Sequence, residues 1–230
     1  MLKERSRNGL PGLPLVLFLL ALAGAAAVGL ARAHHQPAPT AAGIVGLAVV
    51  GFCLLGFFIV SPNEGRVLQL FGKYLGTCRT EGLRWVFPFI TRRSVSLRVR
   101  SFESQKLKVN DLEGNPIEIA AVVVWKVVDT AHACFQVDNV DGFVRTQAES
   151  AVRNTATHFA YDSHEEDQLS LRGSTDAIAD KLKRDIQERL AAAGISVVEA
   201  RISHLAYAPE IAQAMLQRLQ ATAIIAARTK

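Results

Sequence analysis

Two long apolar runs stand near the start of the chain. Residues 13–31 and 41–60 contain no charged side chain, and each meets the length of about 20 residues that a helix needs to cross a bilayer. The polar stretch between them, residues 32–40, contains two prolines, which favour a turn over a continuous helix. The pattern predicts a hairpin of two transmembrane helices, with residues 1–12 as a tail and residues 32–40 as a short external loop.

The flanking charges predict the orientation of this hairpin. Basic residues precede the first run and follow the second, whereas the connecting loop holds Arg32 alone. By the positive-inside rule both ends of the hairpin face the cytoplasm. The chain after residue 60 is therefore expected on the cytoplasmic side of the cell (inner) membrane. The basic residues concerned are Lys3, Arg5, Arg7, Arg66, Lys73 and Arg79.

A different interpretation of the first run stays open. A basic start, an apolar run and the sequence Ala31, Arg32, Ala33 also resemble a signal peptide with an A-x-A cleavage site. Cleavage there would leave residues 41–60 as a single anchor, with the domain that follows still on the cytoplasmic side. The number of membrane crossings, two or one, therefore depends on whether the first run is removed.

From residue 61 onward the apolar runs give way to alternating apolar and polar positions. Residues 61–65 predict a turn and residues 66–71 a short strand. Residues 92–99 alternate regularly, as a half-buried antiparallel strand does, and residues 117–128 are apolar on both faces. The second of these segments therefore predicts a strand in the centre of a sheet.

The second half of the chain shows helical spacing. Apolar positions predict helices over residues 140–159 and 174–193. Asp138 or Asn139 can cap the first helix, and Gly194 follows the second at a position suited to the left-handed conformation.

A strand and a last helix are expected after Gly194. Residues 195–205 predict the strand, and Pro209 begins the helix at its first position. The helical pattern reaches Lys230 without a stop signal, so we expect the natural protein or its assembly to continue it.

One short segment fits none of these patterns. Residues 82–90 place six large apolar side chains around Pro88, in a stretch too short to span a bilayer and poorly patterned for a strand. Two interpretations stay open: a loop folded onto the core of its own domain, and a wedge in the headgroup region of a membrane, where tryptophan is favoured.

The sequence lacks the common patterns of catalytic chemistry. It contains no phosphate loop, dinucleotide fingerprint, nucleophile elbow or zinc-protease motif. The cluster of ionisable residues at 164–167 (HEED) is explained by a short helix that Ser163 caps, and His34 and His35 lack carboxylate or thiolate partners for a metal. We expect no enzyme activity, no cofactor and no metal. Free thiols in a reducing compartment are expected at Cys53, Cys78 and Cys134.

The charge is unevenly distributed. Residues 61–110 hold ten basic and three acidic side chains, whereas residues 111–230 hold twelve basic and seventeen acidic ones. The basic segment follows the apolar runs directly, and such a segment is attracted to an anionic cytoplasmic leaflet. Nucleic-acid binding would need a recognisable reader module, which the sequence lacks, so the expected partner is the bilayer.

Four motifs follow the apolar runs in a fixed order. They are residues 61–67 (SPNEGRV), residues 82–85 (GLRW) with Pro88 and Phe89, the stretch from Ile186 through Gly194 to Ile202, and residues 207–212 (YAPEIA). The series resembles the SPFH or band 7 superfamily, which includes stomatins, prohibitins, flotillins and bacterial regulators of membrane proteases. The resemblance covers residues 60–230.

The resemblance implies a fold and a role. It implies an α+β SPFH domain at residues 61–207 that lies against the membrane, and a helix at residues 208–230 that would begin a coiled coil. The implied role is a non-enzymatic membrane scaffold that forms large homo-oligomers, or hetero-oligomers with a paralogue, and regulates membrane proteins such as proteases. A second role stays open: a regulatory subunit that binds and restrains one membrane protease, of AAA or NfeD type, or one transporter.

Two sets of functional residues follow from this comparison. The apolar loop at residues 85–90 matches the place where relatives touch the bilayer, and the last helix matches the segment through which they assemble. The expected membrane-interface residues are Trp85, Val86, Phe87, Phe89, Arg92 and Arg93. The expected oligomerisation residues are Ile211, Met215, Leu219 and Ile225.

Overall fold

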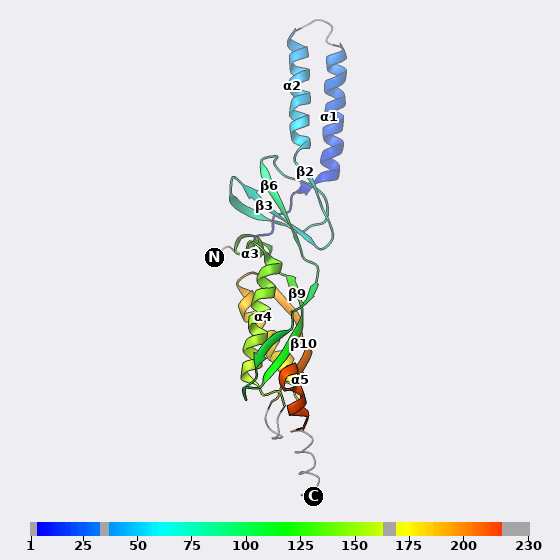
Figure 1. Cartoon of the computed structure of the whole chain (residues 1–230). Coiled ribbons are helices and arrows are strands. Elements are labelled where there is room, and N and C mark those ends of the chain that lie inside the picture. The colour runs from blue at the N-terminus through cyan, green and yellow to red at the C-terminus, as the bar shows by residue number, and fades with distance from the viewer. Residues whose placement is uncertain (1–3, 33–36, 163–168, 218–230) are drawn as a thin grey trace. The chain divides into compact units, whose positions relative to one another are not determined.

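A computed structural model describes residues 4–32, 37–162 and 169–217 (Figure 1). The chain forms two compact units: unit 1 is Met1–Arg98 with Asp129–Phe135, and unit 2 is Val99–Val128 with Gln136–Lys230. The segment predicted as one domain, residues 61–207, is therefore divided between the two units.

Unit 1 begins with two apolar helices, α1 (Gly12–Arg32) and α2 (Pro37–Leu54), which lie side by side (Figure 1). The two helices approach closely at Gly43 of α2, where an added Cβ atom would lie 3.0 Å from a methyl carbon of Leu30. Among the described residues, α1 is the one helix long and apolar enough to cross a membrane, and the apolar stretch of α2, Thr40–Leu54, is shorter.

The second apolar run differs from the single helix predicted over residues 41–60. α2 begins at Pro37, inside the predicted loop, because proline is accommodated in the first turn of a helix. α2 ends at Leu54, and β2 (Phe57–Val60) follows it. Periodicity cannot separate a short apolar strand from the end of an apolar helix, and here β2 gains backbone hydrogen bonds from β5 (Gly82–Trp85).

Two three-stranded sheets complete unit 1. β5 lies between β1 (Leu10–Pro11) and β2 and is antiparallel to both. β3 (Glu64–Leu70) lies between β4 (Lys73–Cys78) and β6 (Ile90–Ser96), again antiparallel. α3 (Thr130–Phe135) contacts β3 and β4. The core contains Val60, Leu68, Cys78, Val86 and Ile90.

The strand predicted over residues 92–99 is present but shifted. β6 runs over Ile90–Ser96, and the next strand begins at Arg100. The N–H of Leu97 donates to the carbonyl of Asn63, 2.9 Å away, in the turn before β3. The alternating pattern continues to Val99 although β6 ends at Ser96, and the chain passes from unit 1 to unit 2 between Arg98 and Val99.

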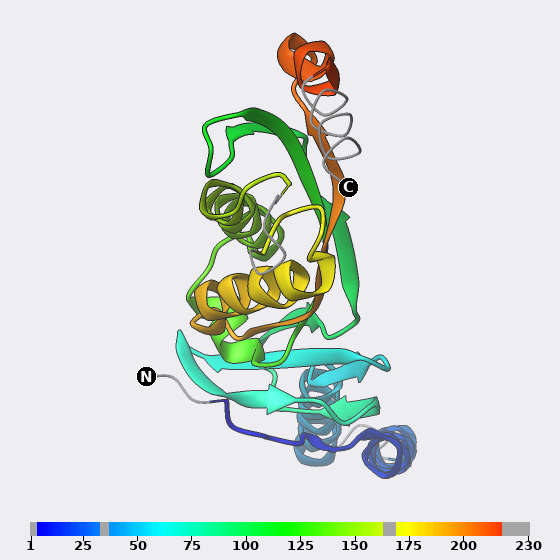
Figure 2. The same cartoon turned by 90° about the horizontal axis from the view of Figure 1, so that it is seen from below.

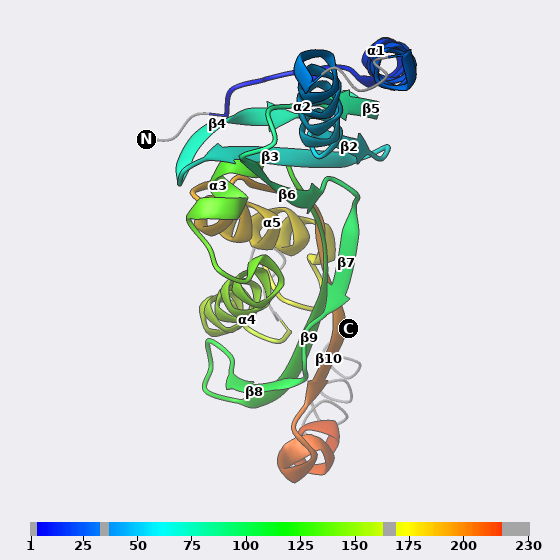
Figure 3. The same cartoon turned by 90° about the horizontal axis from the view of Figure 1, so that it is seen from above.

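Unit 2 is a sheet with two helices on one face, α4 (Val140–His158) and α5 (Thr175–Ala191), as Figures 2 and 3 show. The long strand β9 (Pro116–Val127) pairs with β10 (Ile195–Tyr207) along one edge. Its other edge pairs with β7 (Arg100–Glu103) and β8 (Leu107–Asn110). The prediction of a central strand over residues 117–128 is confirmed.

The helices of unit 2 follow their sequence signals. The side chain of Asn139 caps α4 by accepting a hydrogen bond from the N–H of Gly142. Gly194 adopts φ +70° after α5, as predicted for a residue that ends a helix in the left-handed conformation. Residues 209–217 are helical, and Pro209 begins that helix as expected. The apolar face of α5 is fully buried at Ile178, Leu182, Ile186 and Leu190.

Candidate functional site

Four phenylalanines form a partly exposed cluster in unit 1, named here the aromatic patch: Phe52, Phe71, Phe87 and Phe89. Phe52 comes from α2, Phe71 from the turn between β3 and β4, and the other two from the loop between β5 and β6. The ring centroid of Phe89 lies 5.5 Å from those of Phe52 and Phe87 and 6.4 Å from that of Phe71. Contiguous exposed apolar surfaces are typical of sites that contact a protein or a membrane, which makes the aromatic patch a candidate site.

Phe71 is the most exposed member of the patch and was missed by the sequence analysis. Its side chain is 85% exposed, and its φ of +47° is unusual for a residue other than glycine. With Gly72 it forms a two-residue turn between Leu70 and Lys73, which are paired in the β3–β4 ladder. Asparagine or glycine suits such a turn, so folding alone does not account for a phenylalanine there.

Trp85 and Val86 face inward. The indole N–H of Trp85 donates to the carbonyl of Cys53, 2.8 Å away, near the end of α2. Val86 is buried in the core of unit 1. Within residues 82–90, Val86 and Ile90 are therefore buried, whereas Phe87 and Phe89 are exposed.

Arg92 secures the end of α2, while Arg93 is exposed on the same strand. The guanidinium group of Arg92 donates to the carbonyls of Leu55 and Phe57, at 2.9 and 3.0 Å, and lies over the ring of Phe58. Partial burial, and then the like charge of Arg66, lower the pKa of Arg92 below its usual value. Arg92 therefore complements carbonyl oxygens that follow a helix C-terminus.

The expected oligomerisation residues are only partly described. Ile211 and Met215 lie one helical turn apart and are half-buried, while Leu219 and Ile225 lie outside the described residues. Lys108 on β8 ties the start of this helix to unit 2 through an ion pair with Glu210, at 2.7 Å. The side-chain hydrogen bond and charge of Lys108 lower the pKa of Glu210.

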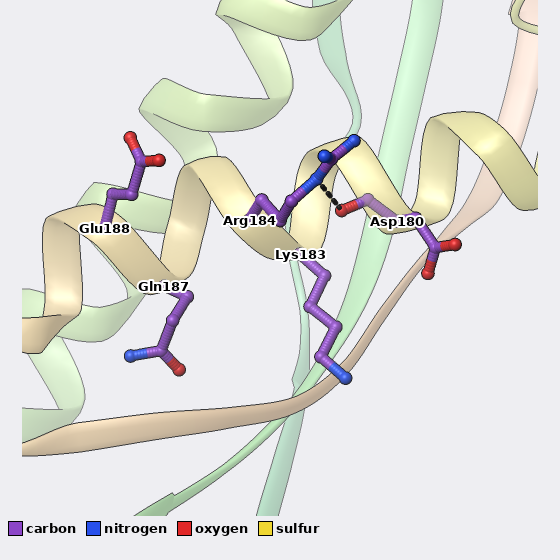
Figure 4. A pocket seen from close by; sticks show the side chains of 5 residues that line it. All are labelled: Asp180, Lys183, Arg184, Gln187 and Glu188. Atoms are coloured by element: carbon purple, nitrogen blue, oxygen red, sulfur yellow. Dashed lines mark hydrogen bonds between the residues drawn. The ribbon is translucent and has the colours of Figure 1, made fainter.

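A depression on α5 is lined by polar side chains but is already engaged with its own chain (Figure 4). The amide of Gln187 donates to the carbonyl of Ile195 and accepts from the N–H of Val197. The Nε of Arg184 donates to the carbonyl of Asp180. The side chains that line it are Asp180, Lys183, Arg184, Gln187 and Glu188.

Metal-binding groups do not converge in the part of the chain that the structure describes. There, no set of three or more histidine, cysteine, aspartate or glutamate side chains could hold a metal ion. The pair His34 and His35 and the cluster of ionisable residues at 164–167 lie outside the described residues.

The fold defines a class: a protein of mixed helices and strands with an apolar helix near its N-terminus. The chain matches the SPFH domain / Band 7 family over residues 58–230, and it belongs to that family. The match confirms the resemblance found in the sequence. Members of the family are generally non-enzymatic, membrane-associated scaffolds that self-oligomerise. A comparison with curated proteins found no match.

Proposed function

We propose that this protein is a membrane-anchored scaffold that self-associates, organises a patch of membrane and thereby modulates membrane proteins or proteases. One observation carries the proposal: the apolar helices and the aromatic patch meet at Phe52. Its ring lies on α2 and is 6.3 Å from that of Phe87 and 5.5 Å from that of Phe89. A bilayer that takes up α2 therefore meets the aromatic patch at its surface.

The patch also compensates for the short second helix. The apolar stretch Thr40–Leu54 is about 22 Å long at about 1.5 Å per residue, less than the roughly 30 Å of a hydrocarbon core. Leu55 and Ile59 continue the exposed apolar surface beyond it. The aromatic patch then extends this surface further, so α1 and α2 together can insert as a hairpin.

Two exposed basic residues lie close in sequence to members of the patch. Lys73 follows the Phe71 turn directly, and Arg93 lies on β6 close to Phe89 in sequence; both are exposed. Each basic residue near an anionic leaflet contributes about 1 kcal/mol of attraction. Unit 1 is accordingly proposed to rest on the cytoplasmic leaflet, with Phe87 and Phe89 in the headgroup region.

An environment-sensitive fluorophore tests this contact. The full chain, with its cysteines replaced by alanine, is labelled at Phe71→Cys and placed in vesicles that contain anionic lipid and shallow spin-labelled quencher lipid. We expect a blue-shifted, quenched emission. The matched control is Asn63→Cys, because Asn63 is also exposed with positive φ, at 58°, but lies at the other end of β3. Equal quenching at both positions, or at neither, would contradict the proposed contact.

Imaging of single particles tests the scaffold role. The full chain is extracted in a mild detergent without removing proteins that co-purify. Rings or cages of this subunit are expected, because family members self-oligomerise. Small particles with a second protein at fixed stoichiometry would instead favour the regulatory subunit of one protease or transporter.

A further inference from the structure

The segment before α1 is hydrogen-bonded into unit 1. The carbonyl of Arg5 accepts from the N–H of Thr77 at 2.8 Å, and the N–H of Arg7 donates to the carbonyl of Thr77 at 3.0 Å. These bonds place Ser6 beside Thr77 as a parallel bridge on β4. Figure 2 shows the segment running along this part of unit 1 toward α1.

Side chains reinforce this attachment at its far end. The carboxylate of Glu4 binds Arg79 with both oxygens, at 2.7 and 2.8 Å. The same carboxylate accepts a hydrogen bond of 2.8 Å from the N–H of Thr130, the first residue of α3. Asn8 accepts a hydrogen bond from the hydroxyl of Thr80 at 2.7 Å. The side chain of Glu4 is 17% exposed, so it is part of the packed unit rather than of a solvated tail.

Glycines allow the backbone of the segment to come close. A Cβ atom at Gly76 would lie 2.7 Å from the Cβ of Arg7, and one at Gly9 would lie 2.9 Å from the carbonyl oxygen of Trp85. A Cβ atom at Gly12 would lie 2.5 Å from Leu83. The absence of side chains at these positions permits an approach that nearly any other residue would obstruct.

The sheet formed by β1, β5 and β2 connects the two ends of the helix pair. β1 immediately precedes α1, and β2 follows the end of α2 by two residues. β5 lies between them. Its Trp85 pairs with Leu10 of β1 along one edge of the strand and with Phe57 of β2 along the other. The start of α1 and the end of α2 are therefore held by one strand, which requires both ends of the pair to lie on the same side of a bilayer.

We infer that residues 4–11, which end in β1, are an integral part of unit 1, and that Glu4 fastens them to Arg79, directly after β4, and to α3. The mature protein accordingly retains α1, since cleavage after Ala31 or Ala33 would remove one strand of the β1–β5–β2 sheet. The inference rests on the proposed function only for the insertion of α1 and α2 into a bilayer.

A disulfide cross-link tests the strand directly. In the full chain with Cys53, Cys78 and Cys134 replaced by alanine, Asn8→Cys is combined with Thr80→Cys and oxidised in vesicles. An intramolecular disulfide is expected, detected by mass spectrometry. The control combines Asn8→Cys with Phe71→Cys, because Phe71 precedes β4 whereas Thr80 follows it. Absence of the Asn8–Thr80 link, while each single cysteine still reacts with maleimide, would overturn the inference.

Labelling from outside the cell tests the topology. Single cysteines at Asn8 and Asn63 should react with a membrane-impermeant maleimide only after permeabilisation, whereas Thr40→Cys should react before it. Opposite behaviour of Asn8→Cys and Asn63→Cys would overturn the inference. The two proposals fail separately. A monomer that forms the Asn8–Thr80 disulfide would contradict the scaffold role alone. Rings in which this disulfide does not form would contradict the attachment of residues 4–11 alone.

Hydrogen exchange tests the role of Glu4. Loss of a hydrogen bond to a charged group should accelerate exchange of the Thr130 amide about tenfold in Glu4→Ala. The control is Glu81→Gln, which changes an exposed carboxylate in the same unit. Unchanged exchange at Thr130 would show that Glu4 does not fasten the segment.

Discussion

Phe71 combines an exposed aromatic ring with a backbone conformation that disfavours it. Asparagine adopts positive φ more readily, so Phe71→Asn should raise the free energy of unfolding by about 1 kcal/mol. The same change should weaken contact with anionic vesicles, because it removes an apolar ring from the aromatic patch. Denaturant titration in detergent and a vesicle-contact assay measure the two effects.

If Phe71→Asn raises the free energy of unfolding but weakens vesicle contact, Phe71 serves contact with the membrane rather than folding. Leu112→Asn is a suitable control, because Leu112 is also exposed but belongs to unit 2. A loss of both stability and vesicle contact in Phe71→Asn would instead indicate that the ring supports the fold.

Gly56 is required by the packing of Trp85. A Cβ atom there would lie 2.4 Å from the indole nitrogen and 2.4 Å from the carbonyl oxygen of Val86. Gly56→Ala should therefore destabilise the protein by about 1–3 kcal/mol, seen as an earlier unfolding transition in detergent. Gly51→Ala, where nothing lies within 4 Å, should have little effect. Equal effects would exclude the packing of Trp85 as the cause.

At the scale of elements, the end of α2 depends on a strand distant in sequence. Arg92→Gln removes the charged donors that bind the carbonyls of Leu55 and Phe57, and should cost about 1.5 kcal/mol. Arg93→Gln changes an exposed arginine on the same strand and should stay within about 0.5 kcal/mol of the parent. Limited proteolysis after Leu54, which should increase only in Arg92→Gln, distinguishes local fraying from general unfolding.

Periodicity predicted best the elements that are packed or paired along their whole length. α5 has four buried residues at helical spacing, and β9 has both of its edges paired, as predicted for a central strand. β2 was missed because its apolar residues continue those of α2. The loop after β5 was ambiguous because inward Val86 and outward Phe87 carry the same apolar chemistry.

At the scale of the whole molecule, long-range contacts limit what the sequence reveals. The order of motifs was sufficient to identify the family. By contrast, no local pattern indicates that Glu4 binds Thr130, 126 residues away. The first twelve residues contain the charges typical of a cytoplasmic tail, and residues 4–11 among them are hydrogen-bonded to β4 and β5. This attachment is made by backbone hydrogen bonds, which the composition of the segment does not reveal.

Assembly through the last helix gives a prediction for the complete protein. Ile211 and Met215 lie near one face, one turn apart, and an aspartate there would oppose burial against a neighbouring copy because a buried, unpaired charge is costly. The double variant Ile211→Asp with Met215→Asp should shift detergent-solubilised particles to a smaller mass, as measured by light scattering after size exclusion.

Gln213→Asp provides the matched control, because Gln213 is exposed on the same helix and the new charge is the same. Its particles should keep the parent mass. Both half-buried positions also contact their own chain, so the melting temperature of each variant is measured alongside. A smaller particle with an unchanged melting temperature supports assembly through this face, whereas parent-sized particles in the double variant would place the assembly surface elsewhere.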